Sequence, residues 1–400
     1  MRKIFILSPD NGGCNFYRCW MPLAYLGDQQ RLKGYISYGM IDYEFFAGKP
    51  RKIQALGVQR PFKREVLSRI MRWAPITFVD IDDNFFDLFP KNPAYHDLKK
   101  AREDLPYDPL DVHKKALQSA EVITVSTEPL KEAIIEHTGR NRNIRVIPNG
   151  FYNKYTESEV NLARNRMGTR PIRVGWWGGF HHHDDWKPLD KKLAAYIETS
   201  NAEFVFMGWL PPHVARTCKV EFWPWAHVTM FYEALMNMDL DICIAPIVEN
   251  QFSICKSNIK FLETAMYKRC FVGMKHPIWK GLFHEKTGLV AANADEMIEC
   301  VDYLIKNPDK INEYGETAYG LVQKEYHISK RADDWMAVFE HLFQRSDNYE
   351  FEIPQKDLAD YRKARPDLPI EAFEKMLNNP CSLNRPETMW FSWDSDDNRS

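Results

Sequence analysis

Two lysines and a glutamate near residue 260 carry the clearest chemical signal in the sequence. Lys256 and Lys260 are followed by Glu263, which comes one helical turn beyond Asn258–Lys260. If a helix begins near Ser257, its unpaired backbone N–H groups and the two ammonium groups form a strong diphosphate site. Glu263 could then accept hydrogen bonds from two hydroxyl groups of a ribose or another sugar. In the alternative interpretation, both lysines are simply solvated.

Three carboxylates crowd the end of the apolar run Phe78–Ile81, namely Asp80, Asp82 and Asp83. Like charges at this spacing repel each other and shift each other's pKa. A fold normally avoids them unless a ligand, a metal or a hydroxyl group uses them. We therefore predict that they bind a substrate hydroxyl or act as a base. The alternative is an acidic cap for the helix that follows.

Two double-glycine turns follow apolar runs, at Gly12–Gly13 and at Gly178–Gly179. Glycines at a strand-to-helix turn let backbone N–H groups approach an anion. The first turn lacks the G-x-G-x-x-G spacing, so a dinucleotide fingerprint is not supported. The second turn leads into His181–His183. Consecutive histidines point in different directions and seldom bind one metal, so we predict no metal site, with His182 as a ligand contact.

Positive charge is concentrated in one segment of an otherwise balanced chain. The formal net charge is −2, so a polyanionic partner must be held by a patch. Between Lys49 and Arg72 there are eight basic residues and one acid, Glu65. The phosphate-contacting candidates there are Lys63, Arg64, Arg69 and Arg72. The alternative is a solvated amphipathic helix over Lys63–Trp73.

Short apolar runs alternate with helical patterns along most of the chain, which is the rhythm of parallel α/β sheets. The rhythm predicts two doubly wound domains, residues 1–165 and 171–345, that face an interdomain cleft. Residues 346–400 are broken by prolines and carry twelve acids and seven bases, so we predict an acidic C-terminal extension. Helices are expected at Tyr17–Leu26, Pro109–Ser119, Leu189–Glu198, Met230–Asn237 and Ile259–Tyr267.

The composition is that of a globular chain, with 400 residues of which 44% are hydrophobic. No apolar stretch approaches the length of a membrane span, and no export signal is visible. The eight cysteines include no Cys-x-x-Cys pair, so we interpret them as reduced thiols and predict a cytoplasmic protein.

Together these segments resemble retaining glycosyltransferases of the GT-B fold, in the large family-4 group. That group closes its first domain with a strand ending in Ile-Pro-Asn-Gly and a hydrophobic residue, which Ile147–Phe151 matches. Val122–Thr127 resembles the preceding strand. The second domain follows the family order at Arg173–Gly179, Phe204–Gly208, Asp239–Pro246, Lys256–Glu263 and Thr287–Val290. The similarity covers about residues 1–345.

The resemblance implies that Glu263 binds the nucleotide ribose and that Lys256, Ser257 and Lys260 surround the diphosphate or donor sugar. With the turns and their neighbours, the donor-binding candidates are Gly12, Gly13, Arg18, Gly178, Gly179, His182, Ser257, Asn258 and Glu263. The catalytic candidates are Asp80, Asp82, Asp83, Lys256 and Lys260. Two departures stand out: Gly179–His183 replaces the usual Arg and Lys, and Cys255 replaces the usual first glutamate.

The resemblance predicts transfer of a sugar from a nucleotide sugar, with a UDP-sugar favoured and no metal or other cofactor required. The carboxylate cluster, Gly12–Arg18 and Lys256–Glu263 resemble a sub-branch common in bacteriophage genomes. This favours phage DNA with a hydroxymethylated pyrimidine as acceptor, in a host cytoplasm, and the base would be flipped out of the stack. The alternatives are a surface polysaccharide, a lipid-linked glycan or a protein as acceptor, a nucleotide-sugar epimerase, and a non-catalytic binding module.

Overall fold

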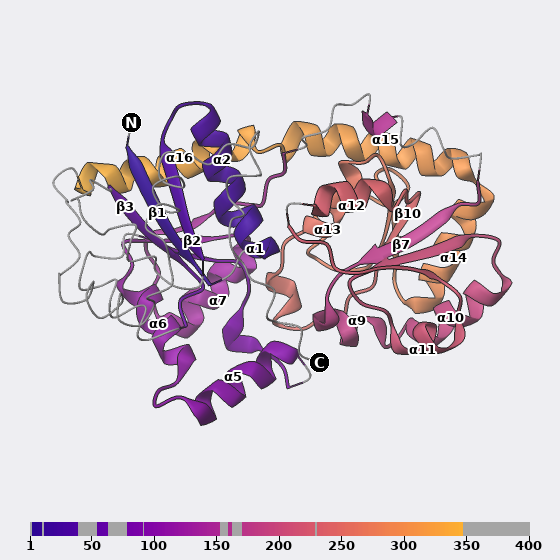
Figure 1. The fold of residues 1–400 in the computed structure, drawn as a ribbon, viewed down its shortest axis with the longest axis horizontal. Coiled ribbons are helices and arrows are strands. Elements are labelled where there is room, and N and C mark those ends of the chain that lie inside the picture. The colour runs from indigo at the N-terminus through magenta and orange to yellow at the C-terminus, as the bar shows by residue number, and fades with distance from the viewer. Residues whose placement is uncertain are drawn as a thin grey trace, which may run out of the picture.

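The computed structural model describes eight stretches of the chain, which are residues 2–9, 12–38, 54–62, 78–90, 92–152, 159–161, 170–228 and 230–346. In these stretches the chain forms two α/β domains, each built on a parallel sheet of six strands. Figure 1 shows the two domains side by side along the long axis of the molecule. The predicted fold class, two doubly wound domains, is confirmed.

The first sheet has the strand order β2-β1-β3-β4-β5-β6, and all its paired strands are parallel. Its strands are β1 (Lys3–Ser8), β2 (Lys33–Tyr38), β3 (Ala55–Gln59), β4 (Phe78–Ile81), β5 (Val122–Val125) and β6 (Ile144–Val146). Its helices are α1 (Gly13–Asn15), η1 (Phe16–Trp20), α2 (Met21–Asp28), η2 (Phe85–Asp87), α5 (Pro93–Asp104), α6 (Pro109–Ser119) and α7 (Glu128–Thr138). Strands β3, β4 and β5 are buried throughout, because helices cover both faces of a parallel sheet.

Local sequence fixes where three of these helices begin. Asn92, Asp108 and Thr127 each cap a helix whose first turn contains proline, and each side chain accepts a hydrogen bond from a backbone N–H of that first turn. Proline suits this place because its missing N–H would have no intrahelical partner. Helix α7 ends at Gly139, whose φ of 69° is left-handed and favours glycine. Thr127 thus starts α7 at the carboxyl end of β5, where the second domain approaches.

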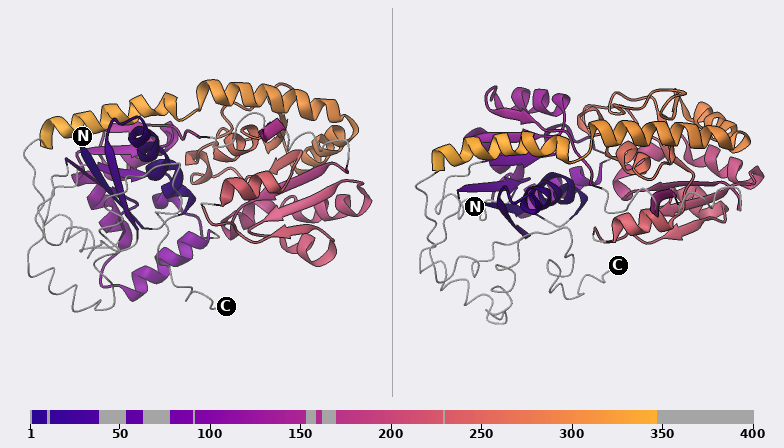
Figure 2. Two further views of the ribbon diagram at one scale, coloured as in Figure 1. Left: turned by 45° about the horizontal axis from the view of Figure 1, so that its top comes forward. Right: turned by 90° about the horizontal axis from the view of Figure 1, so that it is seen from above.

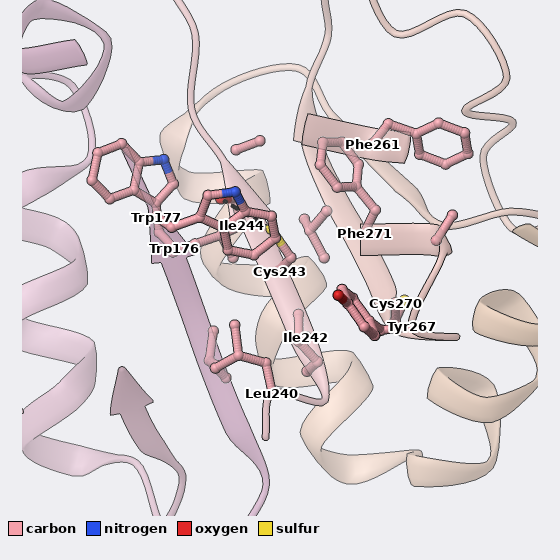
Figure 3. Close-up of a cluster of buried hydrophobic side chains, with 14 of the residues drawn as sticks. Trp176, Trp177, Leu240, Ile242, Cys243, Ile244, Phe261, Tyr267, Cys270 and Phe271 are labelled. Carbon is pink, nitrogen blue, oxygen red and sulfur yellow. Dashed lines mark hydrogen bonds between the residues drawn. The ribbon is translucent and has the colours of Figure 1, made fainter. Parts of the chain in front are cut away.

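The second sheet has the strand order β12-β11-β10-β7-β8-β9, again with parallel pairs only. Its strands are β7 (Arg173–Trp177), β8 (Glu203–Met207), β9 (Glu221–Trp223), β10 (Ile242–Ala245), β11 (Cys270–Met274) and β12 (Leu289–Ala291). Its helices are η3 (Phe180–His182), α9 (His183–Trp186), α10 (Asp190–Thr199), α11 (Pro212–Thr217), α12 (Phe231–Asn237), η4 (Ser253–Cys255), α13 (Ile259–Ala265), α14 (Ala294–Lys306) and α15 (Pro308–Glu325). Figure 3 shows part of its core, in which side chains of β7, β10 and β11 pack with Phe261 of α13.

The last described helix, α16 (Ser329–Ser346), leaves the second domain and packs on the first. Trp335, Phe339 and Leu342 are buried there with Ile4 and Leu23 of the first domain. Figures 1 and 2 show α15 over the second domain and α16 continuing across the first. The predicted boundary placed residues up to 345 in the second domain, so the packing of α16 corrects that boundary.

The chain therefore passes between the domains twice, and the two passages are hydrogen-bonded to each other. Phe151 donates its N–H to the carbonyl of Tyr326, at 3.0 Å, and accepts the N–H of Ile328, at 2.8 Å. The predicted connector 164–170 lies outside the described residues except for Arg170. No described helix has both the length and the apolarity of a membrane span.

Candidate functional site

The strand orders locate one ligand-binding edge in each domain. In the first sheet, successive strands run outward in opposite directions from the boundary between β1 and β3, and in the second from the boundary between β7 and β10. Ligands of open α/β sheets bind beyond the carboxyl ends of the strands at such a switch point. Gly12–Gly13 follows β1, and Gly178–Gly179 follows β7. Both double-glycine turns therefore lie where the topology favours a ligand.

The two switch points face each other across the interdomain boundary. Thr127 Oγ1 of the first domain donates to the carbonyl of Cys255 in the second, at 2.7 Å. Asn149 Nδ2 donates to Ser257 Oγ at 2.9 Å, and Asn84 Nδ2 lies 3.6 Å from Cys255 Sγ. These contacts hold the segment that leads into α13 against the first domain.

The helix after the first glycine turn carries a π-helical stretch. Gly12 is the N-cap of α1, and a Cβ on Gly13 would meet no atom within 4 Å. Residues Phe16–Trp20 then form η1 before the chain continues as α2. Such π-helical turns occur often at functional sites, because the extra residue re-aims the neighbouring side chains. Here Tyr17 and Arg18 are both buried.

Asp80 and Arg18 form a fully buried ion pair in the first domain. Arg18 Nη2 donates to Asp80 Oδ2 at 2.8 Å, and the two side chains are 1% and 0% exposed. Thr124 Oγ1 donates to the same oxygen, also at 2.8 Å. Arg18 also donates to Asn149 Oδ1 at 3.2 Å and stacks over the ring of Trp335. Both side chains therefore have partners inside the first domain, and their predicted parts in the reaction and in donor binding stay predictions.

Asp82 and Asp83 lie beyond the end of β4, in a different environment. The donor atoms of Cys14, Asp82 and Asp83 all lie within 4.8 Å of one another, and among the described residues they form the one group with metal-like spacing. Arg60 Nε lies 4.0 Å from Asp82 Oδ1, with Arg60 at a φ of 44°. Burial raises the pKa of Asp82 to about 6, because the charge of Arg60 offsets only part of the desolvation.

Arg60 lies beside this carboxylate pair, and in the sequence it stands out only as one member of the basic segment. Its left-handed backbone is uncommon for a side chain of this size and often marks a functional site. Its N–H donates to the carbonyl of Asp80, at 3.1 Å, which fixes the loop after β3 against β4. In the sequence, Arg60 could have been singled out because it directly follows the strand Ala55–Gln59.

Glu263 is the best-connected side chain at the second switch point. It is 6% exposed, and it accepts hydrogen bonds from Tyr17 Oη at 2.7 Å and from Trp177 Nε1 at 2.8 Å. Burial raises its pKa, although Lys260 and both donors favour the charged form. The predicted position of Glu263 on α13 is confirmed, but its partner Tyr17 comes from the other domain and was not predicted.

The charge of Lys260 acts on this carboxylate, and the charges of Lys256 and Lys260 both act on His182. Lys260 Nζ donates to the carbonyl of Trp177 and lies 5.2 Å and 5.0 Å from the rings of Trp176 and Trp177. Burial lowers the pKa of Lys260. Burial also lowers the pKa of His182 to about 4, and the charges of both lysines act in the same direction. The two lysine charges repel each other, and such a pair favours an anionic ligand.

His182 is oriented by a carboxylate. Its Nδ1 donates to Asp185 Oδ2 at 2.8 Å, and Asp185 Oδ1 accepts the N–H of Val248 at 2.9 Å. A neutral ring that donates through Nδ1 keeps Nε2 as a hydrogen-bond acceptor. Gly178 is required by packing, since a Cβ there would meet the ring of Trp176 at 2.4 Å, whereas Gly179 is more open.

Helix α13 begins at Ile259, as expected for the helix Ile259–Tyr267. Asn258 is its N-cap but its side chain caps no helical N–H, and instead Nδ2 donates to the carbonyl of Lys280 at 2.6 Å. Ser257 accepts from Asn149 as described above. The side chains of Ser257 and Asn258 thus have partners within the protein, so their predicted donor-binding role stays a prediction.

The predicted acceptor residues Lys63, Arg64, Arg69 and Arg72 lie outside the described residues, as does the extension from residue 347 onward. The part of the basic segment that the structure describes contains Arg60 alone among its cations. Binding of a polyanion by this segment therefore stays a prediction.

A family model matches part of the chain, mostly within the second domain. Residues 219–337, which include α13 and both lysines, match a family model described as glycosyl transferase-like. No curated protein sequence matches the chain. The family match confirms the predicted glycosyltransferase domain.

Solved structures resemble the chain over most of its length at low sequence identity. Sucrose-phosphate synthase from Thermosynechococcus elongatus has a TM-score of 0.57 and 12% identity, over 86% of this chain and 100% of that one. Anabaena HepE in complex with UDP-glucose has a TM-score of 0.59 and 12% identity, over 85% and 100%. WaaG, a glycosyltransferase involved in lipopolysaccharide biosynthesis, has a TM-score of 0.56 and 10% identity, over 84% and 99%. The predicted GT-B fold is confirmed.

Proposed function

We propose that this protein transfers a sugar from a UDP-sugar to a hydroxyl group of an acceptor, with retention at the anomeric carbon. The observation that carries the proposal is the grouping of Lys256, Lys260 and Glu263 at the switch point of the second sheet. These residues fall within the glycosyl transferase-like match. Support for UDP as the nucleotide comes from HepE, which shares the fold and was solved with UDP-glucose.

Each group at the second switch point has a part in donor binding under this proposal. Lys256 and Lys260 bind the diphosphate, helped by the backbone N–H of Gly179, since the N–H of Gly178 donates to the carbonyl of Met207 at 3.0 Å. Glu263 accepts hydrogen bonds from the ribose hydroxyls. His182, held by Asp185, offers Nε2 to a hydroxyl of the donor sugar. Burial is the main cause of the lowered pKa values of Lys260 and His182, and a diphosphate bound beside Lys260 would favour the charged form of its ammonium group.

The chemical step needs stabilisation of the leaving group more than a protein nucleophile. The bond between the anomeric carbon and the UDP oxygen breaks, and a bond to the acceptor oxygen forms on the same face of the sugar. The acceptor proton passes to the departing phosphate oxygen. Lys256 and Lys260 stabilise the negative charge that develops on UDP. Electrostatic stabilisation of this kind usually makes the largest contribution to the rate enhancement.

The carboxylates after β4 are placed to orient the acceptor. Asp82 and Asp83 lie at the switch point of the first domain, and Arg60 balances part of their charge. An ionised Asp82 accepts a hydrogen bond from the acceptor hydroxyl and aligns it for attack. This gives Asp82 a positioning part in the reaction, while the proton itself goes to the phosphate.

For the acceptor we propose duplex DNA that carries a hydroxymethylated pyrimidine. Support comes from the eight basic residues between Lys49 and Arg72, since phosphate contacts supply most of the affinity of proteins for DNA. The segment belongs to the first domain, on the acceptor side. A base inside the stack is out of reach of an enzyme site, so the target nucleotide would be flipped out.

The test is a transfer assay with a panel of UDP-sugars and three duplexes, containing hydroxymethylcytosine, hydroxymethyluracil or unmodified bases. The DNA is digested to nucleosides and analysed by mass spectrometry. The proposal expects a hexose or pentose increment on one modified nucleoside, none on unmodified DNA, and none with the Lys256→Ala/Lys260→Ala double variant.

The outcomes separate the two parts of the proposal. UDP release without any sugar on DNA would keep the glycosyltransferase and move the acceptor to a polysaccharide, a lipid-linked glycan or a protein. Absence of UDP binding and of UDP release with every sugar nucleotide would overturn the donor assignment itself.

A further inference from the structure

A tyrosine from the first domain donates a hydrogen bond to Glu263, the carboxylate that is proposed to bind ribose. Tyr17 Oη donates to Glu263 Oε1 at 2.7 Å, and the two residues are separated by 246 positions in the chain. They are 7% and 6% exposed, so both are buried. Trp177 Nε1 donates to the second oxygen, at 2.8 Å. Both carboxylate oxygens of Glu263 therefore accept a hydrogen bond from the protein, one of them from Tyr17.

The position of Tyr17 is fixed from both domains. Its backbone belongs to the π-helical stretch η1, and the next residue, Arg18, is locked to Asp80 inside the first domain. From the second domain, Tyr232 Oη donates to Tyr17 Oη at 3.3 Å. The ring of Phe16 meets the ring of Tyr232 edge-on, with centroids 5.5 Å apart. The contact between Tyr17 and Glu263 thus joins η1 of the first domain to α13 of the second, and neighbouring residues of both domains support it.

We propose that the Tyr17 hydroxyl stands in for a ribose hydroxyl, holding Glu263 in the donor-free protein and leaving it when the nucleotide binds. The inference rests on the proposed function, because it assigns Glu263 to the ribose. A buried carboxylate that loses a hydrogen bond is costly, so Glu263 needs a donor in both states. The exchange of one hydroxyl for another provides this, and the nucleotide must break the tyrosine contact to enter.

The exchange links nucleotide binding to the boundary between the domains. Tyr17 moves off a residue of the second domain, whereas the hydrogen bonds from Thr127 to Cys255 and from Asn149 to Ser257 involve neither Tyr17 nor Glu263. A ligand shifts a conformational equilibrium by its difference in affinity for the two states. Occupation of Glu263 by ribose therefore favours arrangements in which η1 stands away from α13.

The test is the dissociation constant for UDP, measured by titration calorimetry, in the wild type and in Tyr17→Phe. The variant removes the competing hydroxyl and keeps the ring, so the proposal expects UDP to bind about 3- to 10-fold more tightly. The matched control is Tyr196→Phe. It removes another tyrosine–carboxylate hydrogen bond, from Tyr196 to Asp302 at 3.1 Å, on α10 and α14 away from the first domain (Figure 1). The control should bind UDP as the wild type does.

Weaker binding by Tyr17→Phe would mean that Tyr17 holds the nucleotide, and unchanged binding would mean that the ribose does not displace it. Either result overturns the inference. Failure of the wild type to bind UDP would instead overturn the proposed function. If Tyr17→Phe does not fold, Tyr17→Leu makes the same test, since it also lacks the hydroxyl and keeps an apolar side chain.

Discussion

At the scale of single residues, Lys260 is the side chain whose loss should cost the most activity. It lies between the carbonyl of Trp177 and Glu263, beside the place proposed for the diphosphate. We expect Lys260→Ala to lower kcat for UDP release by about 10²- to 10³-fold, because one preorganised donor to a developing negative charge contributes about that much. The control is Lys192→Ala, which removes a half-exposed lysine paired with Asp295. Circular dichroism checks that both variants are folded, and wild-type kcat in Lys260→Ala would contradict the assignment.

Ionisation of the Asp82 carboxyl group should lower the free energy of unfolding. Its pKa in the folded protein is about 6, above the ordinary value of 3.8, so the folded state binds the proton more tightly than the unfolded state. The free energy of unfolding therefore falls as pH rises from about 4 to 6, and stays lower above that window. Asp82→Asn should then be more stable than the wild type at pH 7, by about 1–3 kcal/mol.

Urea unfolding of wild type and Asp82→Asn at pH 3.5 and pH 7 checks this prediction. The difference between the two proteins should be small at pH 3.5, where the carboxyl group is protonated in both states, and large at pH 7. An equal difference at both pH values would show that burial of Asp82 does not raise its pKa. The same variant should have lower transfer activity at pH 7, since a neutral amide oxygen accepts a weaker hydrogen bond from the hydroxyl than a charged carboxylate does.

Site residues that lie close together in the sequence could be predicted as a group, whereas contacts between residues far apart in the sequence could not. The grouping of Lys256, Lys260 and Glu263 was predicted because the three residues lie close together in the sequence, before and within one helix. The three aspartates were predicted as one group, but Asp80 lies inside β4 while the other two follow its end. Tyr17 was missed as a partner of Glu263, because a contact over 246 positions leaves no local signal.

At the scale of elements, the Arg18–Asp80 pair ties the helix after β1 to strand β4. Both groups are fully buried, so removal of one leaves an unpaired charge. We expect Asp80→Ala to lower the free energy of unfolding by about 3–5 kcal/mol, measured by urea denaturation. Arg18→Met combined with Asp80→Ala should recover part of the loss, because the orphaned charge is gone. If the double variant loses as much free energy of unfolding as the two single variants lose in sum, a direct pairing of Arg18 and Asp80 is contradicted.

The elements themselves were largely visible in the sequence. The helices expected at Pro109–Ser119 and Leu189–Glu198 appear as α6 and α10, with ends that differ by at most one residue. Apolar periodicity and caps such as Asp108 fix these ends locally. The π-helical character of Phe16–Trp20 was not visible, because the pattern of apolar residues is the same for an ordinary helix. Only the packing of Tyr17 and Arg18 distinguishes the two.

At the scale of the whole molecule, the return of α16 makes the domains depend on each other. Trp335, Phe339 and Leu342 fill the core of the first domain from the far end of the described chain. A fragment of residues 1–165 should therefore expose this apolar surface, bind a hydrophobic dye and aggregate. Fusion of residues 329–346 to the fragment should reduce dye binding and restore solubility. Solubility of the bare fragment without dye binding would contradict the role of α16.

This crossing could not be read from the sequence. The apolar stripe of α16 says that one face is buried, but it does not say against which sheet. The predicted boundary at residue 345 assumed that consecutive elements stay in one domain, which is the usual case. The exception is set by packing, with Trp335 under Arg18 and Phe339 beside Phe78.

The most direct test of the account is equilibrium binding of UDP, UMP and uridine to the wild-type protein. The central claim is that Lys256 and Lys260 form a diphosphate site beside a ribose-binding Glu263. Charge-assisted hydrogen bonds from two lysines predict that UDP binds at least about 100-fold more tightly than uridine, with UMP between them. The difference should shrink as salt is added. Equal affinity for UDP and uridine, or no binding of UDP, would contradict the claim.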